Sequence, residues 1–155
     1  MCGLGPAWEC ARRHGRTATG PYRVPVLRAL VLDDQGVLSR AEPGMLAVVE
    51  TVRAAGVRTG LLSNAEGGGH PYGAVMDAAV LSGEAGVRKP QRAAYLLVAQ
   101  RLGVPPADCV FVDDLAVNVR GAVEAGMVGV LHRSVEATTA ELSALFGLPL
   151  TPVES

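Results

Sequence analysis

Two pairs of adjacent carboxylates are the residues of the sequence best placed to form a reactive site, because each pair directly follows an apolar run. Asp33-Asp34 comes after Leu27–Leu32, and Asp113-Asp114 comes after Cys109–Val112. Carboxylates that are brought together repel one another, and they stay ionised only where a cation compensates them. Hard oxygen ligands with open positions suit Mg²⁺ bound jointly by a protein and a phosphate group. A carboxylate in such a site can also attack phosphorus in covalent phosphoryl transfer.

Two further polar positions fit the same chemistry. Ser63-Asn64 follows the apolar run Val57–Leu62, and Lys89 precedes Pro90 at the start of a predicted helix. A serine hydroxyl can donate a hydrogen bond to a phosphate oxygen, and a lysine ammonium can neutralise charge on the same group. Taken singly, each residue has an ordinary structural explanation as a turn residue, a helix cap or a solvated helix start. Their joint order favours one shared site.

Apolar runs alternate with helical patterns through most of the chain. Strands are expected over 27–32, 57–62, 79–82, 109–112 and 128–131, and helices over 43–55, 91–102, 117–125 and 135–146, with a short helical turn over 74–78. Ser134 is the expected N-cap of the last helix. Five strands alternating with helices predict an α/β fold with a parallel sheet. In such sheets a ligand lies beyond the carboxyl ends of the strands, which is where the polar pairs fall.

Composition predicts one core domain with two peripheral segments. The chain has 155 residues, 49% hydrophobic, with a formal net charge of −1, which suggests neither a nucleic-acid nor a membrane partner. Residues 1–26, rich in Gly, Pro and Arg, are expected to form a disordered or loosely attached basic arm before a core over 27–148 and a tail over 149–155. The three cysteines match no zinc or disulfide pattern, which favours a cytoplasmic location.

Four segments together resemble the haloacid dehalogenase (HAD) superfamily of hydrolases. They are LVLDDQGVL at 30–38, GLLSN at 60–64, GEAGVRKP at 83–90 and VFVDDLAVNVRGAVEAGMVGVLH at 110–132. The last two segments are the most specific, and they are closest to the dehalogenase-like and epoxide-hydrolase-N-terminal-like phosphatases. The resemblance implies a three-layer Rossmann-like domain with about five parallel strands.

The resemblance also implies roles in phosphoryl transfer. Asp33 would be the nucleophile that forms an aspartyl-phosphate. Ser63 and Asn64 would bind the phosphate, and Lys89 would bridge the nucleophile and the phosphate.

Mg²⁺ is the cofactor that the resemblance implies. Asp33 and Asp114 would be direct ligands, together with the backbone carbonyl of Gln35. Asp113 would contact the metal through a water molecule, or would support the direct ligands without touching the metal.

The sequence departs from the family pattern at Gln35. The family motif is Asp-x-Asp-Gly, whose second aspartate serves as general acid and then as general base, and Gln35 stands at that position. An amide neither gives nor takes a proton at neutral pH. Losing positioned acid–base catalysis costs about 10²–10⁴ in rate, so we expect impaired catalysis.

A second departure is the absence of a cap domain. Relatives often insert a helical domain after the first motif, whereas here only the six residues 39–44 lead to the next helix. A missing lid leaves the site open to water. An open site suits a phosphorylated macromolecular substrate, or cover by a second copy of the chain or by a partner protein.

Three functions remain open at this point. The first is a Mg²⁺-dependent phosphoesterase or phosphotransferase that is slow because of Gln35. The second is a catalytically degenerate domain that binds a partner or a phosphometabolite. The third, less favoured, is a haloacid dehalogenase, which needs no second aspartate but does need a cap-lined halide pocket.

Overall fold

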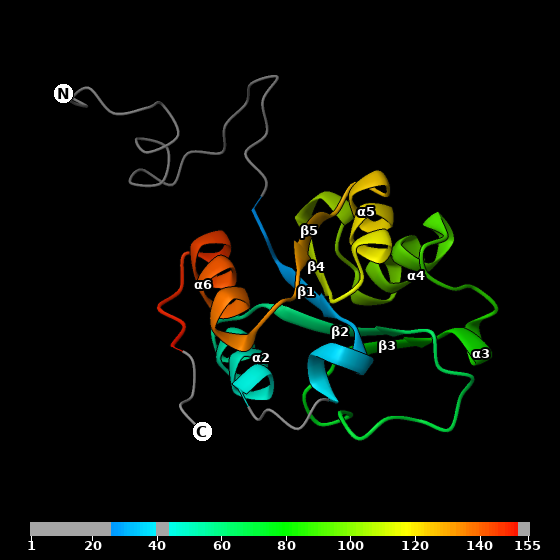
Figure 1. The fold of residues 1–155 in the computed structure, drawn as a ribbon, viewed down its shortest axis with the longest axis horizontal. Coiled ribbons are helices and arrows are strands. Elements are labelled where there is room, and N and C mark those ends of the chain that lie inside the picture. Colours follow the sequence, from blue (N-terminus) through cyan, green and yellow to red (C-terminus); the bar gives the residue numbers. More distant parts are fainter. Residues whose placement is uncertain (1–25, 40–43, 152–155) are drawn as a thin grey trace.

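The computed structural model describes residues 26–39 and 44–151 of the chain. The strands are β1 (Ala29–Leu32), β2 (Arg58–Ser63), β3 (Ala78–Leu81), β4 (Cys109–Asp113) and β5 (Val128–Leu131). The helices are α2 (Gly44–Ala54), α3 (Ser82–Ala85), α4 (Arg92–Leu102), α5 (Ala116–Glu124) and α6 (Val135–Phe146), with short helical segments η1 (Asp34–Leu38) and η2 (Pro106–Asp108). Figure 1 shows how they are arranged.

The five strands form one parallel sheet in the order β3-β2-β1-β4-β5. β1 is therefore central, with β2 and β4 as its hydrogen-bonded neighbours. Leu32 of β1 pairs with Leu61 on one side and with Val112 on the other. This register brings the residue that follows β1 beside the ends of β2 and β4. The carboxyl ends of the three middle strands thus form one continuous rim.

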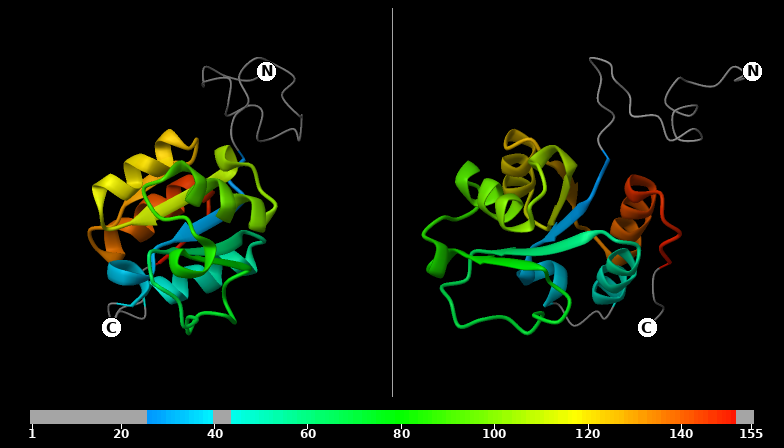
Figure 2. Two further views of the ribbon diagram at one scale, coloured as in Figure 1. Left: turned by 90° about the vertical axis from the view of Figure 1, so that its right-hand side faces the viewer. Right: turned by 180° about the vertical axis from the view of Figure 1, so that it is seen from behind.

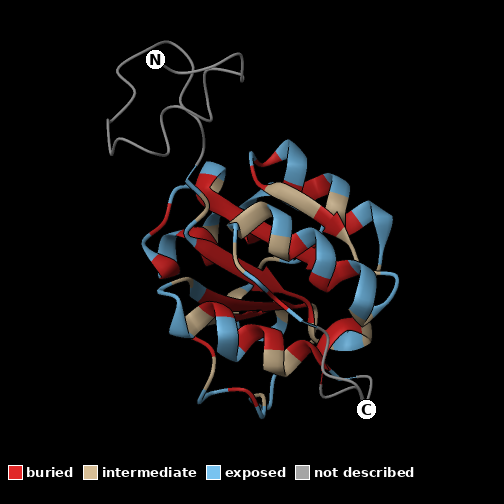
Figure 3. Ribbon diagram, turned by 90° about the vertical axis from the view of Figure 1, so that its left-hand side faces the viewer, coloured by how far each residue is buried: buried red, intermediate tan, exposed pale blue. Residues whose placement is uncertain are grey.

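Side-chain alternation along the strands builds two hydrophobic cores, one on each face of the sheet. Leu30 and Leu32 of β1 face the core that is covered by α2 and α6. Ala29 and Val31 face the opposite core, covered by α4 and α5. The helices accordingly lie on both sides of the sheet (Figure 2), and the three middle strands are buried throughout most of their length (Figure 3). The three-layer α/β architecture that the sequence predicted is confirmed.

Helix boundaries follow from local chemistry. The Ser134 side chain accepts a hydrogen bond from the backbone N–H of Ala137, so it caps α6 as predicted. Gly103 ends α4 in the left-handed conformation, with a φ of 67°. An L side chain is strained there, whereas glycine is not.

Some local predictions were wrong. The helical turn expected over 74–78 lies earlier, where Val75 and Met76 donate backbone hydrogen bonds to the carbonyl of Tyr72. Asp77 then exchanges backbone and side-chain hydrogen bonds with Thr59, which directs the chain into β3. β3 also ends one residue before the predicted strand over 79–82, because Ser82 begins α3.

Parts of other predictions lie outside the described residues: nearly all of the expected basic arm, the end of the expected tail and the predicted first residue of α2. In the described part, no helix has the length and apolarity needed to cross a membrane.

Candidate active site

A pocket of about 560 Å³ opens at the carboxyl rim of the middle strands. Asp33 reaches it from the end of β1, Ser63 from the last position of β2 and Asp114 from just after β4. Lys89 enters from the segment between α3 and α4. The volume is within the range of small-molecule sites in proteins. Residues far apart in sequence therefore converge on one cavity.

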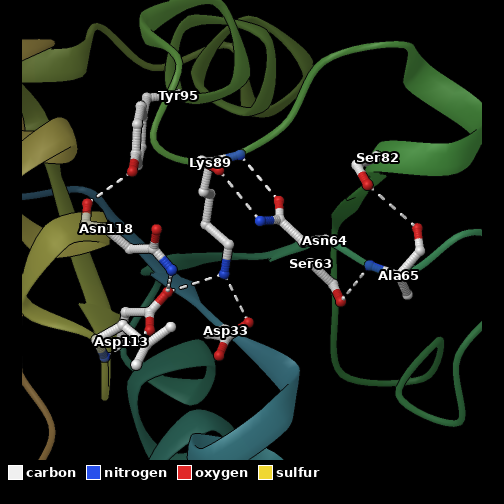
Figure 4. A network of polar contacts seen from close by, with 10 residues as sticks. Asp33, Ser63, Asn64, Ala65, Ser82, Lys89, Tyr95, Asp113 and Asn118 are labelled. Atoms are coloured by element: carbon white, nitrogen blue, oxygen red, sulfur yellow. Dashed lines mark hydrogen bonds and ion pairs between the residues drawn. The ribbon is translucent and has the colours of Figure 1, made fainter.

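Lys89 is the electrostatic centre of the site. Its Nζ lies 2.6 Å from Asp33 Oδ1 and 2.8 Å from Asp113 Oδ2, so one ammonium bridges two carboxylates (Figure 4). The side chain is buried, and Nζ lies 5.6 Å from the centroid of the Phe111 ring. Lys89 is also the only lysine in the sequence. Burial in a low-dielectric site makes both ion pairs stronger than they would be at the surface.

Asn64 holds the backbone of Lys89 in place. Its Oδ1 accepts a hydrogen bond of 2.8 Å from the Lys89 N–H, and its Nδ2 donates one of 3.1 Å to the Lys89 carbonyl (Figure 4). Both polar ends of the amide are thus engaged. Phosphate binding by Asn64 stays a prediction, while the observed contacts make it a positioning residue for Lys89.

Asp113 is a fully buried hub of hydrogen bonds. Its carboxylate accepts from Lys89 Nζ, from Asn118 Nδ2 at 3.0 Å and from the backbone N–H of Leu115 at 2.9 Å. Asn118 is itself fixed, because its carbonyl accepts a 2.6 Å hydrogen bond from the Tyr95 hydroxyl (Figure 4). These donors hold the Asp113 carboxylate in place, and Asp113 in turn fixes the position of Lys89.

Asp33 sits in a less favourable environment. The pKa of its carboxyl is raised to about 6 as the net result of three contributions. Burial raises the pKa most, the ammonium of Lys89 lowers it, and the charges of Asp113 and Asp114 raise it. Its ordinary pKa is 3.8. Because the folded-state pKa is the higher one, ionising Asp33 destabilises the metal-free fold as pH rises from about 4 to about 6.

We therefore expect Asp33→Asn to stabilise the metal-free protein by about 2 kcal/mol at neutral pH. The amide removes the charge and keeps the shape. Urea unfolding in the presence of a chelator measures the effect, which should shrink as pH falls to about 4. Asp34→Asn is the matched control, because Asp34 accepts from the Tyr72 hydroxyl and does not line the pocket. A gain that is equal at acid and neutral pH would contradict this explanation.

Three carboxylates in the site could hold a divalent cation. Ligand atoms of Asp33, Asp113 and Asp114 all lie within 4.8 Å of one another. One ammonium against three carboxylates leaves two negative charges uncompensated, which a divalent cation would balance. The donor set consists of hard oxygens, which suits Mg²⁺. The residues present therefore fit this metal.

Gly36 leaves the space that Asp114 needs. A Cβ at Gly36 would lie 2.1 Å from Asp114 Oδ2, and the residue has a φ of 88°. Asp114 can approach the loop after β1 only because no side chain stands there.

We expect Gly36→Ala to weaken Mg²⁺ binding at least about tenfold, because it displaces Asp114 from the other carboxylates. Gly56→Ala is the matched control: Gly56 has a φ of 91°, but a Cβ there meets nothing within 4 Å. Both variants carry similar backbone strain, so calorimetric titration with Mg²⁺ isolates the contact with Asp114. Equal affinities in the two variants would contradict this role of Gly36.

A family model for haloacid dehalogenase-like hydrolases matches residues 12–126, well over half of the chain. The chain belongs to the haloacid dehalogenase-like hydrolase family. Similar proteins agree with this assignment. Flavin mononucleotide hydrolase 1 of Arabidopsis thaliana is 44% identical over 61 residues, and the glyceraldehyde 3-phosphate phosphatase of Methanopyrus kandleri is 48% identical over 55 residues.

These alignments cover 39% and 35% of this chain but only 25% and 24% of the two relatives, so the chain matches about a quarter of the length of either enzyme. A solved structure matches over a larger share. The crystal structure of an uncharacterized protein from Corynebacterium glutamicum is 39% identical, with a TM-score of 0.71, and the match covers 81% of this chain and 98% of that one. The fold is thus supported by a solved structure, and the haloacid dehalogenase-like hydrolase family by the family model.

Within this HAD-like hydrolase, Gln35 is exposed and lines the pocket next to Asp33. Its neighbour Asp34 is turned toward Tyr72, whose hydroxyl donates a 3.1 Å hydrogen bond to Asp34 Oδ1. Burial and the nearby Asp34 carboxylate raise the pKa of Tyr72 to about 12, so this hydroxyl remains a donor at neutral pH. Asp34 therefore does not take over the acid–base role of the second motif aspartate, whose position is occupied by Gln35.

Ser63 is buried at the pocket wall, where its Oγ accepts a 3.2 Å hydrogen bond from the backbone N–H of Ala65. That bond uses an oxygen lone pair and leaves the hydroxyl hydrogen for a ligand. Sequence reasoning missed Asn118 and Tyr95, which support the site from helices. The available signal was a polar Asn118 on the inward face of a helix that begins directly after Asp113-Asp114.

Proposed function

We propose that the chain is a Mg²⁺-dependent phosphoesterase or phosphotransferase with Asp33 as the nucleophile. The observation that carries the proposal is the bridge of Lys89 between Asp33 and Asp113, beside Asp114 and at the wall of one pocket. A buried carboxylate held by an ammonium next to a cation site is suited to attack on phosphorus.

The metal would be held by Asp33, Asp114 and the backbone carbonyl of Gln35. Asp113 would support these ligands without binding the metal directly. When bound, Mg²⁺ supplies positive charge that compensates the phosphate oxygens. Asp113 already accepts from Lys89, Asn118 and Leu115, which suits a supporting role better than direct ligation.

The remaining polar residues would orient the phosphate. Lys89 presents its ammonium to the phosphate oxygens while holding the Asp33 carboxylate, and Asn64 keeps the Lys89 backbone fixed. Ser63 would donate its hydroxyl hydrogen to another phosphate oxygen. Positioned donors of this kind stabilise the charge that develops during transfer, and they need not reorganise at the moment of reaction.

Phosphate monoesters are the proposed substrates. Two relatives are named for hydrolysis of flavin mononucleotide and glyceraldehyde 3-phosphate, although each match covers only about a quarter of those enzymes. In this chain five residues separate η1 from α2, too few for an inserted cap domain. We propose an uncapped site that accepts a phosphorylated macromolecule, or that a second copy or partner protein covers.

The test is turnover of p-nitrophenyl phosphate with Mg²⁺. Wild type should release p-nitrophenol slowly, and Asp33→Asn should not exceed the rate without protein. Asp34→Asn, altered at the adjacent carboxylate outside the pocket, should retain the wild-type rate. Equal residual rates in wild type and Asp33→Asn would remove the catalytic proposal.

The presence of Gln35 favours a second candidate, a degenerate domain that binds a phosphometabolite or a partner. The Gln35→Asp variant discriminates between the two. A large gain in activity would show intact machinery around Asp33, whereas inactivity of both proteins would favour the binding role.

A further inference from the structure

The pocket contains few groups that can exchange a proton. Among the described residues that line it, the ionisable side chains are Asp33, Lys89 and Asp114. The other lining residues are glycine, alanine, leucine, serines and three amides, of which Gln35 is exposed beside Asp33. Serine and amide side chains do not ionise near neutral pH.

The geometry commits each of the three ionisable groups to another task. Lys89 Nζ is held between two carboxylates, and Asp114 lies against Gly36 in the cluster of carboxylates. Asp33 is the attacking group in the proposed function. Asp34 and His70 lie outside the lining, where Asp34 accepts from the Tyr72 hydroxyl and His70 Nδ1 accepts from the Tyr72 N–H.

We propose that Asp33 takes a phosphoryl group only from donors whose leaving group departs as a stable anion, and that the phosphoryl group then stays on Asp33. Acyl phosphates and activated aryl phosphates form this donor class. The inference rests on the proposed function and adds the substrate class and the fate of the intermediate.

The first step balances without proton transfer. An Asp33 carboxylate oxygen forms a bond to phosphorus, and the bond between phosphorus and the leaving oxygen breaks with its electron pair on that oxygen. A carboxylate or nitrophenolate leaves unprotonated. An alkoxide needs a proton, which no uncommitted side chain in the described pocket lining supplies. Positioned proton donation contributes about 10²–10⁴-fold, so alkyl phosphates should react slower by that factor.

The second step is slow for the same reason. Water must attack phosphorus and lose a proton while the bond between phosphorus and Asp33 breaks, with the electron pair returning to the carboxylate. Gln35 is beside Asp33, but its amide accepts no proton. Hydrolysis of the aspartyl-phosphate is therefore slower than its formation, and the protein accumulates in the phosphorylated form.

The experiment measures intact protein mass after incubation with Mg²⁺ and one of three donors: acetyl phosphate, p-nitrophenyl phosphate or glycerol 1-phosphate. Acetyl phosphate and p-nitrophenyl phosphate should add one phosphoryl group that hydroxylamine releases. Glycerol 1-phosphate should add the group and release phosphate about 10²–10⁴-fold more slowly than p-nitrophenyl phosphate. Asp33→Asn should gain no mass with any donor.

Position 35 offers a matched pair of variants, Gln35→Asp and Gln35→Asn, which differ only in the ability to exchange a proton. Gln35→Asp should turn over glycerol 1-phosphate about 10²–10⁴-fold faster than wild type. After incubation with acetyl phosphate or p-nitrophenyl phosphate, it should no longer show the mass increase. Gln35→Asn should behave as wild type does. Equal lifetimes of the phosphorylated form in the two variants would overturn the inference.

Failure of the inference is distinguishable from failure of the proposed function. If wild type hydrolyses glycerol 1-phosphate as fast as p-nitrophenyl phosphate and gains no mass, the proposed function stands and the inference is wrong. If wild type shows neither mass increase nor turnover with any of the three donors, both are wrong. A mass increase that persists in Asp33→Asn would place the phosphoryl group elsewhere and also overturn the inference.

Discussion

Replacing Lys89 with methionine is expected to lower the free energy of unfolding of the metal-free protein by about 3–5 kcal/mol at neutral pH. Lys89 Nζ contacts Asp33 at 2.6 Å and Asp113 at 2.8 Å, and all three side chains are almost completely buried. Methionine fills much of the same space but leaves both carboxylates without their cation. Urea unfolding in the presence of a chelator measures the loss.

Two comparisons separate lost charge compensation from lost packing. Protonated carboxyls need no cation. Lys89 lowers the pKa of Asp33, which is about 6 in wild type, so this pKa is higher in the variant and the loss should shrink as pH falls toward about 6. The double variant Lys89→Met/Asp33→Asn should recover part of the stability, because it removes one unpaired charge. A loss that depends on neither pH nor Asp33 would assign the effect to packing alone.

The gathering of the site residues was predictable because it follows from strand order. Asp33, Ser63 and Asp113 each close an apolar run, and parallel strands present their carboxyl ends at one rim. The five strands and the three layers were predictable for the same reason. Buried parallel strands appear as continuous apolar runs, and these runs are visible without any tertiary information.

The supporting contacts were not predictable, because they join segments that no local pattern relates. Asn64 binds the backbone of Lys89, 25 residues away, whereas the family resemblance implied only phosphate binding, which stays a prediction. The sequence predicts a helix around Asn118 but not that its amide donates a hydrogen bond to Asp113. The space at Gly36 has meaning only once Asp114 is known to lie against it. Hydrogen bonding and close approach across the fold leave no periodic signal in the sequence.

Addition of Mg²⁺ is expected to raise the free energy of unfolding by about 4 kcal/mol when its free concentration is 1,000 times the dissociation constant. The physical reason is that the carboxylates of Asp33, Asp113 and Asp114 outnumber the one ammonium that faces them. Thermal unfolding with and without Mg²⁺ measures the effect, and a chelator should reverse it. Asp114→Asn should lose most of the stabilisation, whereas Asp34→Asn, altered outside the pocket, should keep it.

The stabilisation by Mg²⁺ should also depend on pH, and it should decrease at low pH because Asp33 becomes protonated. Metal and proton compete for this carboxylate, whose pKa in the metal-free protein is about 6. Above that pH the carboxylate is already ionised, so the affinity for Mg²⁺ should change little. Below it, each unit of pH should weaken binding about tenfold, because a proton must leave before the metal binds. Equal stabilisation by Mg²⁺ at about pH 5 and about pH 8 would show that Asp33 is not a ligand, since protonation at the lower pH would then cost nothing.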